Sequence, residues 1–114
     1  RLATALADVQ AMTGTLTGYL LGAQQDARQL YLIGLHSVRF LMAAGDLLIG
    51  WLLLWHAEVA LAALDRDPAD RAFYQGKVAA AKFFANTVLP RLSADRAVVE
   101  SADLALMGVD EAAF

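Results

Sequence analysis

The sequence predicts an all-α fold, an up-and-down bundle of about three long helices. Apolar residues recur at steps of three and four along most of the 114 residues, a spacing that places them on one face of an α-helix. Only two prolines interrupt the chain, and no segment shows the strict alternation of apolar and polar residues that is typical of a half-buried strand. We expect a single helical domain over residues 1–114.

The first helix is predicted over residues 2–24. Its apolar face consists of Leu2, Leu6, Val9, Met12, Leu16, Tyr19 and Leu20. A second face holds only small residues, namely Ala7, Ala11, Gly14, Gly18 and Gly22. Because each interior glycine costs about 1 kcal/mol of helix propensity relative to alanine, we expect this small face to allow another helix to approach closely.

The second helix is predicted over residues 27–64, after the polar segment Gln24–Asp26. At 1.5 Å per residue it is about 55 Å long, which leaves room for a bend near Gly34 or Ser37. On one face it carries a row of mostly small residues, Arg39, Ala43, Asp46, Gly50, Leu53 and Ala57. We expect this row to face the small residues of the first helix.

Asp46 is therefore a candidate for a buried polar group. An unpaired buried carboxylate is costly, so it would need a cation or backbone donors. Lys77, Lys82 and Arg91 are the candidate cations.

The middle of the second helix, from Phe40 to Trp55, is apolar around most of its circumference. A helix that is apolar all round is usually buried all round, and a bundle of about three helices covers only part of it. We therefore expect a docking surface for something larger, which includes Phe40, Leu47, Trp51 and Trp55. A membrane span is not expected, because polar residues leave only nine consecutive apolar positions and a span needs about 20.

The third helix is predicted to begin at Pro68, the first helical position, with Asp67 as its N-cap and Asp70 in the first turn. The apolar spacing then continues to Leu106. Pro90 is predicted to kink the helix, because proline removes one hydrogen bond and crowds the preceding turn. Gly108 is predicted to end it, which leaves residues 109–114 as a short tail.

Composition excludes several classes of function. The chain is mildly acidic, with a formal charge of −3 and scattered basic residues, so we expect no binding to nucleic acid. It has no cysteine, which excludes disulfides and thiolate metal sites and suits a reducing compartment. A cytoplasmic location is therefore expected. Because the chain begins at Arg1, within helical periodicity, we expect it to be part of a longer protein.

No catalytic, cofactor or metal site is predicted in this chain. His36 and His56, the two histidines, lie about 200° apart around one straight helix and cannot share a ligand there. No glutamate has a histidine three residues later, as the di-iron bundle motif requires. The three glutamates, Glu58, Glu100 and Glu111, are too scattered to nominate as a paired acid and base.

Several short segments, taken in order, carry a resemblance to a known family. They are Gly45–Trp51, Phe73–Lys77, Ala81–Ala85, Leu89-Pro90 and Ala102–Met107. The chain resembles the helical C-terminal domain of many bacterial acyl-CoA dehydrogenases, the acetyl-CoA dehydrogenase C-terminal-like module. The likeness is strongest from Phe40 to Phe114.

The resemblance implies a parent flavoenzyme that uses FAD to oxidise an acyl-CoA thioester to the 2-enoyl-CoA. It also implies that the glutamate base and the main flavin contacts lie in a preceding catalytic domain, so that this fragment is inactive alone and binds no FAD itself. The expected partners are that catalytic domain, a second subunit of a homo-oligomer, or both. The alternative is a stand-alone bundle that binds an apolar ligand in a cavity lined by Trp51, Trp55 and Phe84.

Overall fold

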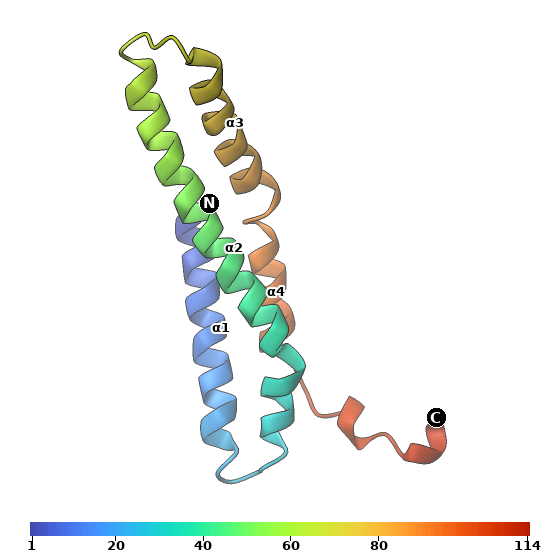
Figure 1. The fold of residues 1–114 in the computed structure, drawn as a ribbon. Coiled ribbons are helices and arrows are strands. Elements are labelled where there is room, and N and C mark those ends of the chain that lie inside the picture. Colours follow the sequence, from blue (N-terminus) through green and yellow to red (C-terminus); the bar gives the residue numbers. More distant parts are fainter.

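The computed structural model describes residues 1–114 as four α-helices and two short 3-10 turns (Figure 1). The α-helices are α1 (Leu2–Gly22), α2 (Gln29–Leu64), α3 (Arg71–Thr87) and α4 (Arg91–Glu100), and the turns are Leu106–Gly108 and Glu111–Ala113. There is no strand. The predicted all-α fold of three helical segments is confirmed, and the predicted kink at Pro90 divides the third segment into α3 and α4.

The helices form an elongated plate. Helix α2 runs from one end of the molecule to the other, α1 lies beside its first half, and α3 lies beside its second half (Figure 1). Helix α4 packs against both α1 and α2. The chain measures 67 × 30 × 15 Å, and its radius of gyration is 19.7 Å, against about 13 Å for a compact domain of this length. A thickness of 15 Å accommodates no more than two layers of helices.

The core lies where α1, α2 and α4 meet. It consists of Ala5, Val9, Met12, Ala43, Leu89, Leu92 and Val99. Only 13 of the 114 residues are buried, although 59% of the sequence is hydrophobic. Most apolar side chains are therefore left partly exposed by this chain.

The row of small residues on α2 allows close packing, as predicted. Ala43, Gly50 and Ala57 are buried. A Cβ atom added at Gly50 would lie 2.9 Å from Leu89 Cδ2, so only glycine fits there without a shift of that side chain. The neighbour of Gly50 is thus the connection between α3 and α4, and not the small face of α1.

The predicted role of the small face of α1 was wrong. Gly14 and Gly18 are exposed, and a Cβ atom at either would meet no other atom within 4 Å. Helix α1 turns its larger side chains toward its neighbours instead, and Met12 is fully buried. Burying large apolar side chains removes more surface from water than burying a glycine face does.

Alanine at Gly14 or Gly18 is expected to raise the free energy of unfolding by up to about 1 kcal/mol, because it improves helix propensity and meets no neighbour. Urea unfolding followed by circular dichroism measures the change. Gly50→Ala serves as the control and is expected to lack this gain, because its methyl group collides with Leu89. A lower free energy of unfolding for Gly14→Ala would contradict the finding that Gly14 faces open space.

The ends of the third segment differ from the prediction. Helix α3 begins at Arg71 after Asp70, and Asp67 is not its N-cap, because Asp67 adopts a left-handed conformation with φ of 49°. Its carboxylate instead accepts a hydrogen bond from Arg71.

Helix α4 ends at Glu100, well before Gly108. Beyond Glu100 the chain leaves the plate, and a short helix without packing is marginal in water.

Helix α2 is close to its prediction at both ends. It begins at Gln29 and ends at Leu64, and it continues without interruption through Gly34 and Ser37, where the sequence left room for a bend. The Ser37 hydroxyl donates a hydrogen bond to the carbonyl of Gly34 within the helix.

Candidate functional site

Helix α2 exposes a large apolar surface. Thirteen of its large hydrophobic side chains are exposed: Leu30, Tyr31, Leu35, Val38, Leu41, Met42, Leu48, Ile49, Trp51, Leu54, Trp55, Val59 and Leu61. A monomeric soluble protein rarely exposes so extensive an apolar surface, and such surfaces mark interaction sites. This surface is the candidate functional site.

Two indole rings form part of this surface. Trp51 is 51% exposed and Trp55 is 54% exposed, and their ring centroids lie 6.0 Å apart with an interplanar angle of 25°. Phe40 and Leu47, the other two residues of the predicted docking surface, are half-buried and pack against the core. The structure thus places the two indoles on the open surface and the other two residues at its edge.

An apolar groove runs between the start of α1 and the middle of α2. Its volume is about 360 Å³, and only hydrophobic residues line it: Leu2, Leu6, Ala44, Leu47, Leu48 and Trp51. We call it the Trp51 groove. Trp51 also lines a neighbouring hollow with Leu54, Trp55 and Glu58. Trp51 is the residue that the two hollows share.

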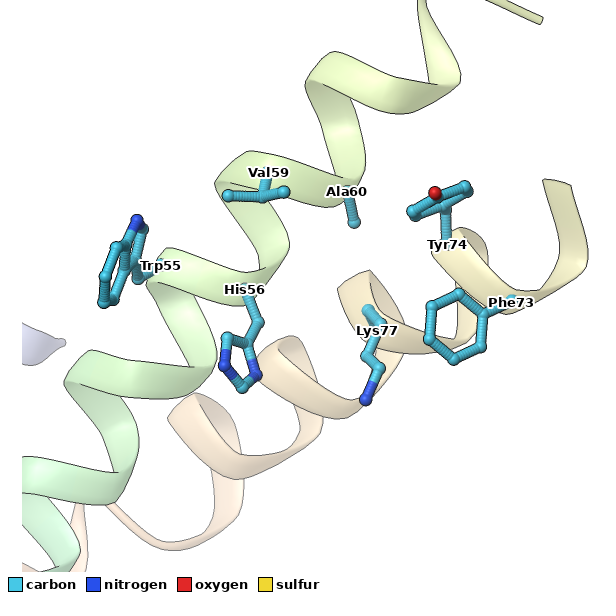
Figure 2. A pocket seen from close by; sticks show the side chains of 7 residues that line it. All are labelled: Trp55, His56, Val59, Ala60, Phe73, Tyr74 and Lys77. Carbon is cyan, nitrogen blue, oxygen red and sulfur yellow. The ribbon is translucent and has the colours of Figure 1, made fainter. Parts of the chain in front are cut away.

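A second groove of about 370 Å³ lies between the end of α2 and the start of α3 (Figure 2). It is lined by Trp55, His56, Val59, Ala60, Phe73, Tyr74 and Lys77. The Lys77 ammonium lies 5.1 Å from the centre of the Phe73 ring, in range of a cation–π interaction. The predicted ligand cavity is not formed here or elsewhere, because Phe84 packs against the core and shares no hollow with the indoles.

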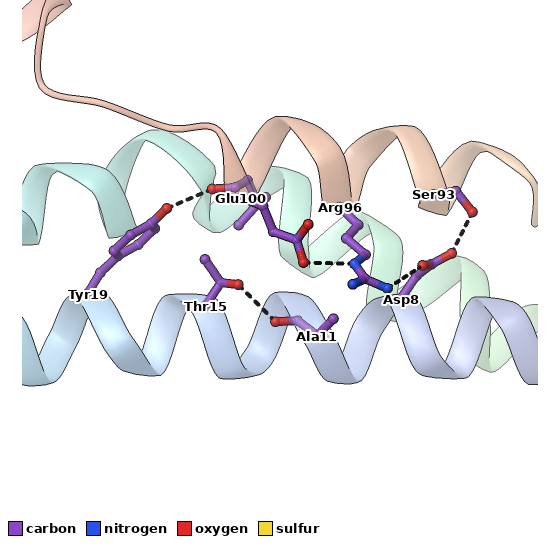
Figure 3. A network of polar contacts seen from close by, with 8 residues as sticks. Asp8, Ala11, Thr15, Tyr19, Ser93, Arg96 and Glu100 are labelled. Carbon is purple, nitrogen blue, oxygen red and sulfur yellow. Dashed lines mark hydrogen bonds and ion pairs between the residues drawn. The ribbon is translucent and has the colours of Figure 1, made fainter.

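A polar network on the opposite edge joins α4 to α1 (Figure 3). Asp8 is 5% exposed, and its carboxylate accepts hydrogen bonds from the Ser93 hydroxyl at 2.6 Å and from Arg96 at 3.3 Å. Arg96 also donates to Glu100 at 2.8 Å. The hydrogen bonds that Arg96 donates, first the one to Glu100 and then the one to Asp8, raise the pKa of its guanidinium. Every charged group in the network has a partner, so the network holds two helices together.

Tyr19 extends this contact between α1 and α4. Its hydroxyl donates a hydrogen bond of 2.8 Å to the carbonyl of Val99 (Figure 3). Burial, and then the negative charge of Glu100, raise the pKa of the Tyr19 phenol. A phenol that stays neutral and donates to a backbone carbonyl has a structural role.

The buried carboxylate is Asp8, which sequence reasoning missed. Asp46, the predicted candidate, is half-buried and forms no ion pair with Lys77, Lys82 or Arg91. The signal for Asp8 was its position, three residues after Ala5 and four before Met12, both of which are buried.

The structure brings no metal-binding cluster together. No group of three or more histidine, aspartate or glutamate side chains is placed to hold a metal ion. His56 is exposed beside the second groove, and His36 is half-buried with its Nδ1 atom buried and unpaired.

Helix α2 also satisfies the length and composition requirements of a membrane span. Its most apolar window has a mean hydropathy of 1.9, and 17% of that window is buried within the chain. Core helices of soluble proteins satisfy the same requirements, and α2 carries Arg39 and Asp46 near its middle. Arg39 forms an ion pair with Asp95 of α4. That this helix does not span a membrane stays a prediction.

Comparison with known proteins gives the family. Residues 1–110 match the model of the acetyl-CoA dehydrogenase C-terminal-like family. The chain is 57% identical over 115 residues to the broad-specificity linear acyl-CoA dehydrogenase FadE5 of Mycobacterium tuberculosis, with 99% of this chain and 19% of that protein covered. It is 35% identical over 86 residues to a butyryl-CoA dehydrogenase of Syntrophomonas wolfei, with 73% of this chain and 14% of that protein covered.

The chain thus spans about a fifth of the length of the first relative and about a seventh of the second. The match to the family model covers nearly the whole chain, and it agrees with the resemblance carried by the packing motifs. The chain therefore belongs to the acetyl-CoA dehydrogenase C-terminal-like family and is the helical C-terminal domain of an acyl-CoA dehydrogenase family protein.

Proposed function

We propose that this domain docks against the catalytic part of an FAD-dependent acyl-CoA dehydrogenase through the Trp51 groove, and that it helps to fix the arrangement of that enzyme. The parent would oxidise an acyl-CoA to the 2-enoyl-CoA. The domain contributes no residue to the chemistry. Its task is to hold the catalytic part in place and to cover one of its surfaces.

The thinness of the plate is the observation that carries this proposal. With a thickness of 15 Å, the chain leaves Trp51 and Trp55 half-exposed, although a fully buried aromatic side chain removes about 150–250 Å² from water. Covering the remaining half of one indole therefore removes about 100 Å², which stabilises the complex by about 2.5 kcal/mol at 25 cal/mol per Å². Two adjacent indoles provide a strong anchor of the kind found at interface hot spots.

Hydroxyl-radical footprinting with mass spectrometry tests the proposal. Oxidation of Trp51 is compared between the 114-residue chain and the complete dehydrogenase that carries it. Docking is expected to lower this oxidation at least about tenfold in the complete protein, because a covered indole is shielded from solvent. Equal oxidation of Trp51 in both proteins would refute docking through the groove.

Matched variants locate the contact. In the complete protein, Leu6→Glu places a charge in the Trp51 groove and is expected to restore oxidation of Trp51. Leu21→Glu is the control, because Leu21 is exposed on the same helix but lies outside the groove. If both variants behave alike, the groove is not the docking site.

A further inference from the structure

The second groove, between the end of α2 and the start of α3, combines aromatic rings with polar groups. Only hydrophobic residues line the Trp51 groove, whereas three residues of the second groove carry hydrogen-bond donors: His56, Tyr74 and Lys77. Its volume of about 370 Å³ lies near the lower end of the range of about 300–1,000 Å³ that is typical of small-molecule sites. The groove therefore has the size and the mixed lining of a site for a small ligand.

The three donors have no partner within the chain. Lys77 forms no ion pair. None of the side-chain hydrogen bonds involves His56, Tyr74 or Lys77. The Nδ1 atom of His36 is the one buried side-chain atom without a partner, so the donors of the second groove face solvent. They are thus available to a ligand that replaces water there.

The charge of the second groove is positive. Lys77 supplies it, and no acidic residue lines the groove. Helix α3 carries three basic residues, Arg71, Lys77 and Lys82, and no acidic one, although the whole chain has a formal charge of −3. The neighbouring acids along the chain, Glu58 and Asp70, lie outside the groove. Charge complementarity therefore favours an anionic ligand.

The aromatic rings hold the cation at the groove. Phe73 and Tyr74 are in contact edge to face, with ring centroids 5.4 Å apart and an interplanar angle of 76°. The Lys77 ammonium lies 5.1 Å from the centre of the Phe73 ring, one helical turn away. In Figure 2 the side chains of His56 and Lys77 extend on the same side of the groove, from α2 and α3. An anionic group on that side meets both of them.

We propose that the second groove binds a small aromatic carboxylate. The ring of the ligand packs against Phe73, Tyr74 and Val59, and its carboxylate accepts hydrogen bonds from Lys77 and His56. A hydrogen bond to a charged group is about twice as strong as one between neutral groups, and packing between aromatic rings adds to it. An aliphatic anion lacks the second contribution, and an aromatic ligand without a negative charge lacks the first.

This inference goes beyond the proposed docking and does not rest on it. The second groove and the Trp51 groove have no residue in common. Trp55, which belongs to the indole pair of the docking proposal, also lines the second groove, but Phe73 and Lys77 take no part in that docking. The site also differs from the cavity predicted from the sequence, which required Trp51 and Phe84. Variants on α3 can therefore disturb the site and leave docking intact.

Titration with naphthalene-2-carboxylate, followed by nuclear magnetic resonance of the ¹⁵N-labelled 114-residue chain, tests the proposal. Saturable shifts are expected for the backbone amides of residues 56–60 and 73–77, which form the groove. The Kd is expected to be about 1 mM or lower, as ordinary binding efficiency gives for a ligand of this size. Acetate, which has no ring, and 2-naphthylmethylammonium, which has the opposite charge, are each expected to bind at least about tenfold more weakly.

Matched variants identify the cation. Lys77→Met keeps the length and helix propensity of the side chain but removes its charge, so the Kd for naphthalene-2-carboxylate is expected to rise about three- to fivefold. Lys82→Met removes a charge from the same helix outside the groove and is expected to leave the Kd unchanged. Unshifted amides in α1 and α4 show that each variant is folded.

A second pair of variants identifies the ring. Phe73 and Phe83 are both exposed on α3, at 60% and 69%, and only Phe73 lines the groove. Phe73→Leu is expected to raise the Kd about threefold, whereas Phe83→Leu leaves it unchanged. Leu6→Glu, which disturbs the Trp51 groove, is also expected to leave this Kd unchanged. Failure of docking and failure of ligand binding are therefore distinguishable.

Several results would overturn the proposal. Shifts that do not saturate, or that saturate at the Trp51 groove instead, would place no carboxylate in the second groove. Equal affinity for 2-naphthylmethylammonium, or equal effects of Lys77→Met and Lys82→Met, would show that Lys77 does not select the charge. Tighter binding of decanoate than of naphthalene-2-carboxylate would show that the groove selects an aliphatic chain and not an aromatic ring.

Discussion

Replacing Leu92 with alanine is expected to lower the free energy of unfolding by about 2–5 kcal/mol. Leu92 has no exposed surface and lies on α4 in the core that α1, α2 and α4 share. The substitution removes three heavy atoms and leaves a cavity that rigid helices close only in part. A domain with 13 buried residues has few other contacts to offset the loss.

Urea unfolding, followed by circular dichroism at 222 nm, measures this loss. Leu61→Ala is the matched control, because Leu61 is 52% exposed and lies outside the core. We expect that control to change the free energy of unfolding by no more than about 0.5 kcal/mol. Equal effects of the two substitutions would show that α4 does not contribute to the core.

Replacing Gly50 with leucine is expected to cost about 1–3 kcal/mol, the second-largest effect. A Cβ atom at Gly50 would lie 2.9 Å from Leu89 Cδ2 and 3.2 Å from its Cδ1. Leu89 is only 2% exposed, so it has little room to move aside. The gain in helix propensity, about 1 kcal/mol, does not offset this overpacking.

Gly14→Leu is the control for that prediction, because a side chain at Gly14 projects into open space. It gains the same helix propensity and meets no neighbour, so stability is expected to rise. The two melting temperatures should therefore move in opposite directions. A rise in both would mean that α2 and the α3–α4 connection separate easily, contrary to the packing at Gly50.

Much of the fold could be predicted from the sequence, because helical spacing and two prolines define most of its boundaries. Helices α1 and α2 were predicted to within two residues at each end. The end of α4 could not be predicted, because the apolar spacing continues to Leu106 while the chain leaves its neighbours after Glu100. Spacing shows which side chains share a face, but not whether another helix covers that face.

The same limit explains why the sequence did not show which glycine has a close neighbour and which carboxylate is buried. Gly14 and Gly50 lie in similar rows of small residues, yet only Gly50 has a close neighbour. Asp8 and Asp46 both lie beside apolar residues, and only the arrival of α4 on α1 decides that Asp8 is buried. The exposed indoles could be predicted, because a helix that is apolar all round exceeds what two neighbours can cover.

The thin plate also has a consequence for how this domain melts. Since each helix layer has one of its sides open, the docking proposed above would add contacts with the catalytic part to those that stabilise the chain. Its thermal midpoint would then be higher in the complete protein than in the 114-residue chain, because a partner that binds only the folded state stabilises it. Folding and docking would become one linked equilibrium, in which a substitution on the catalytic part destabilises this domain without changing any of its residues.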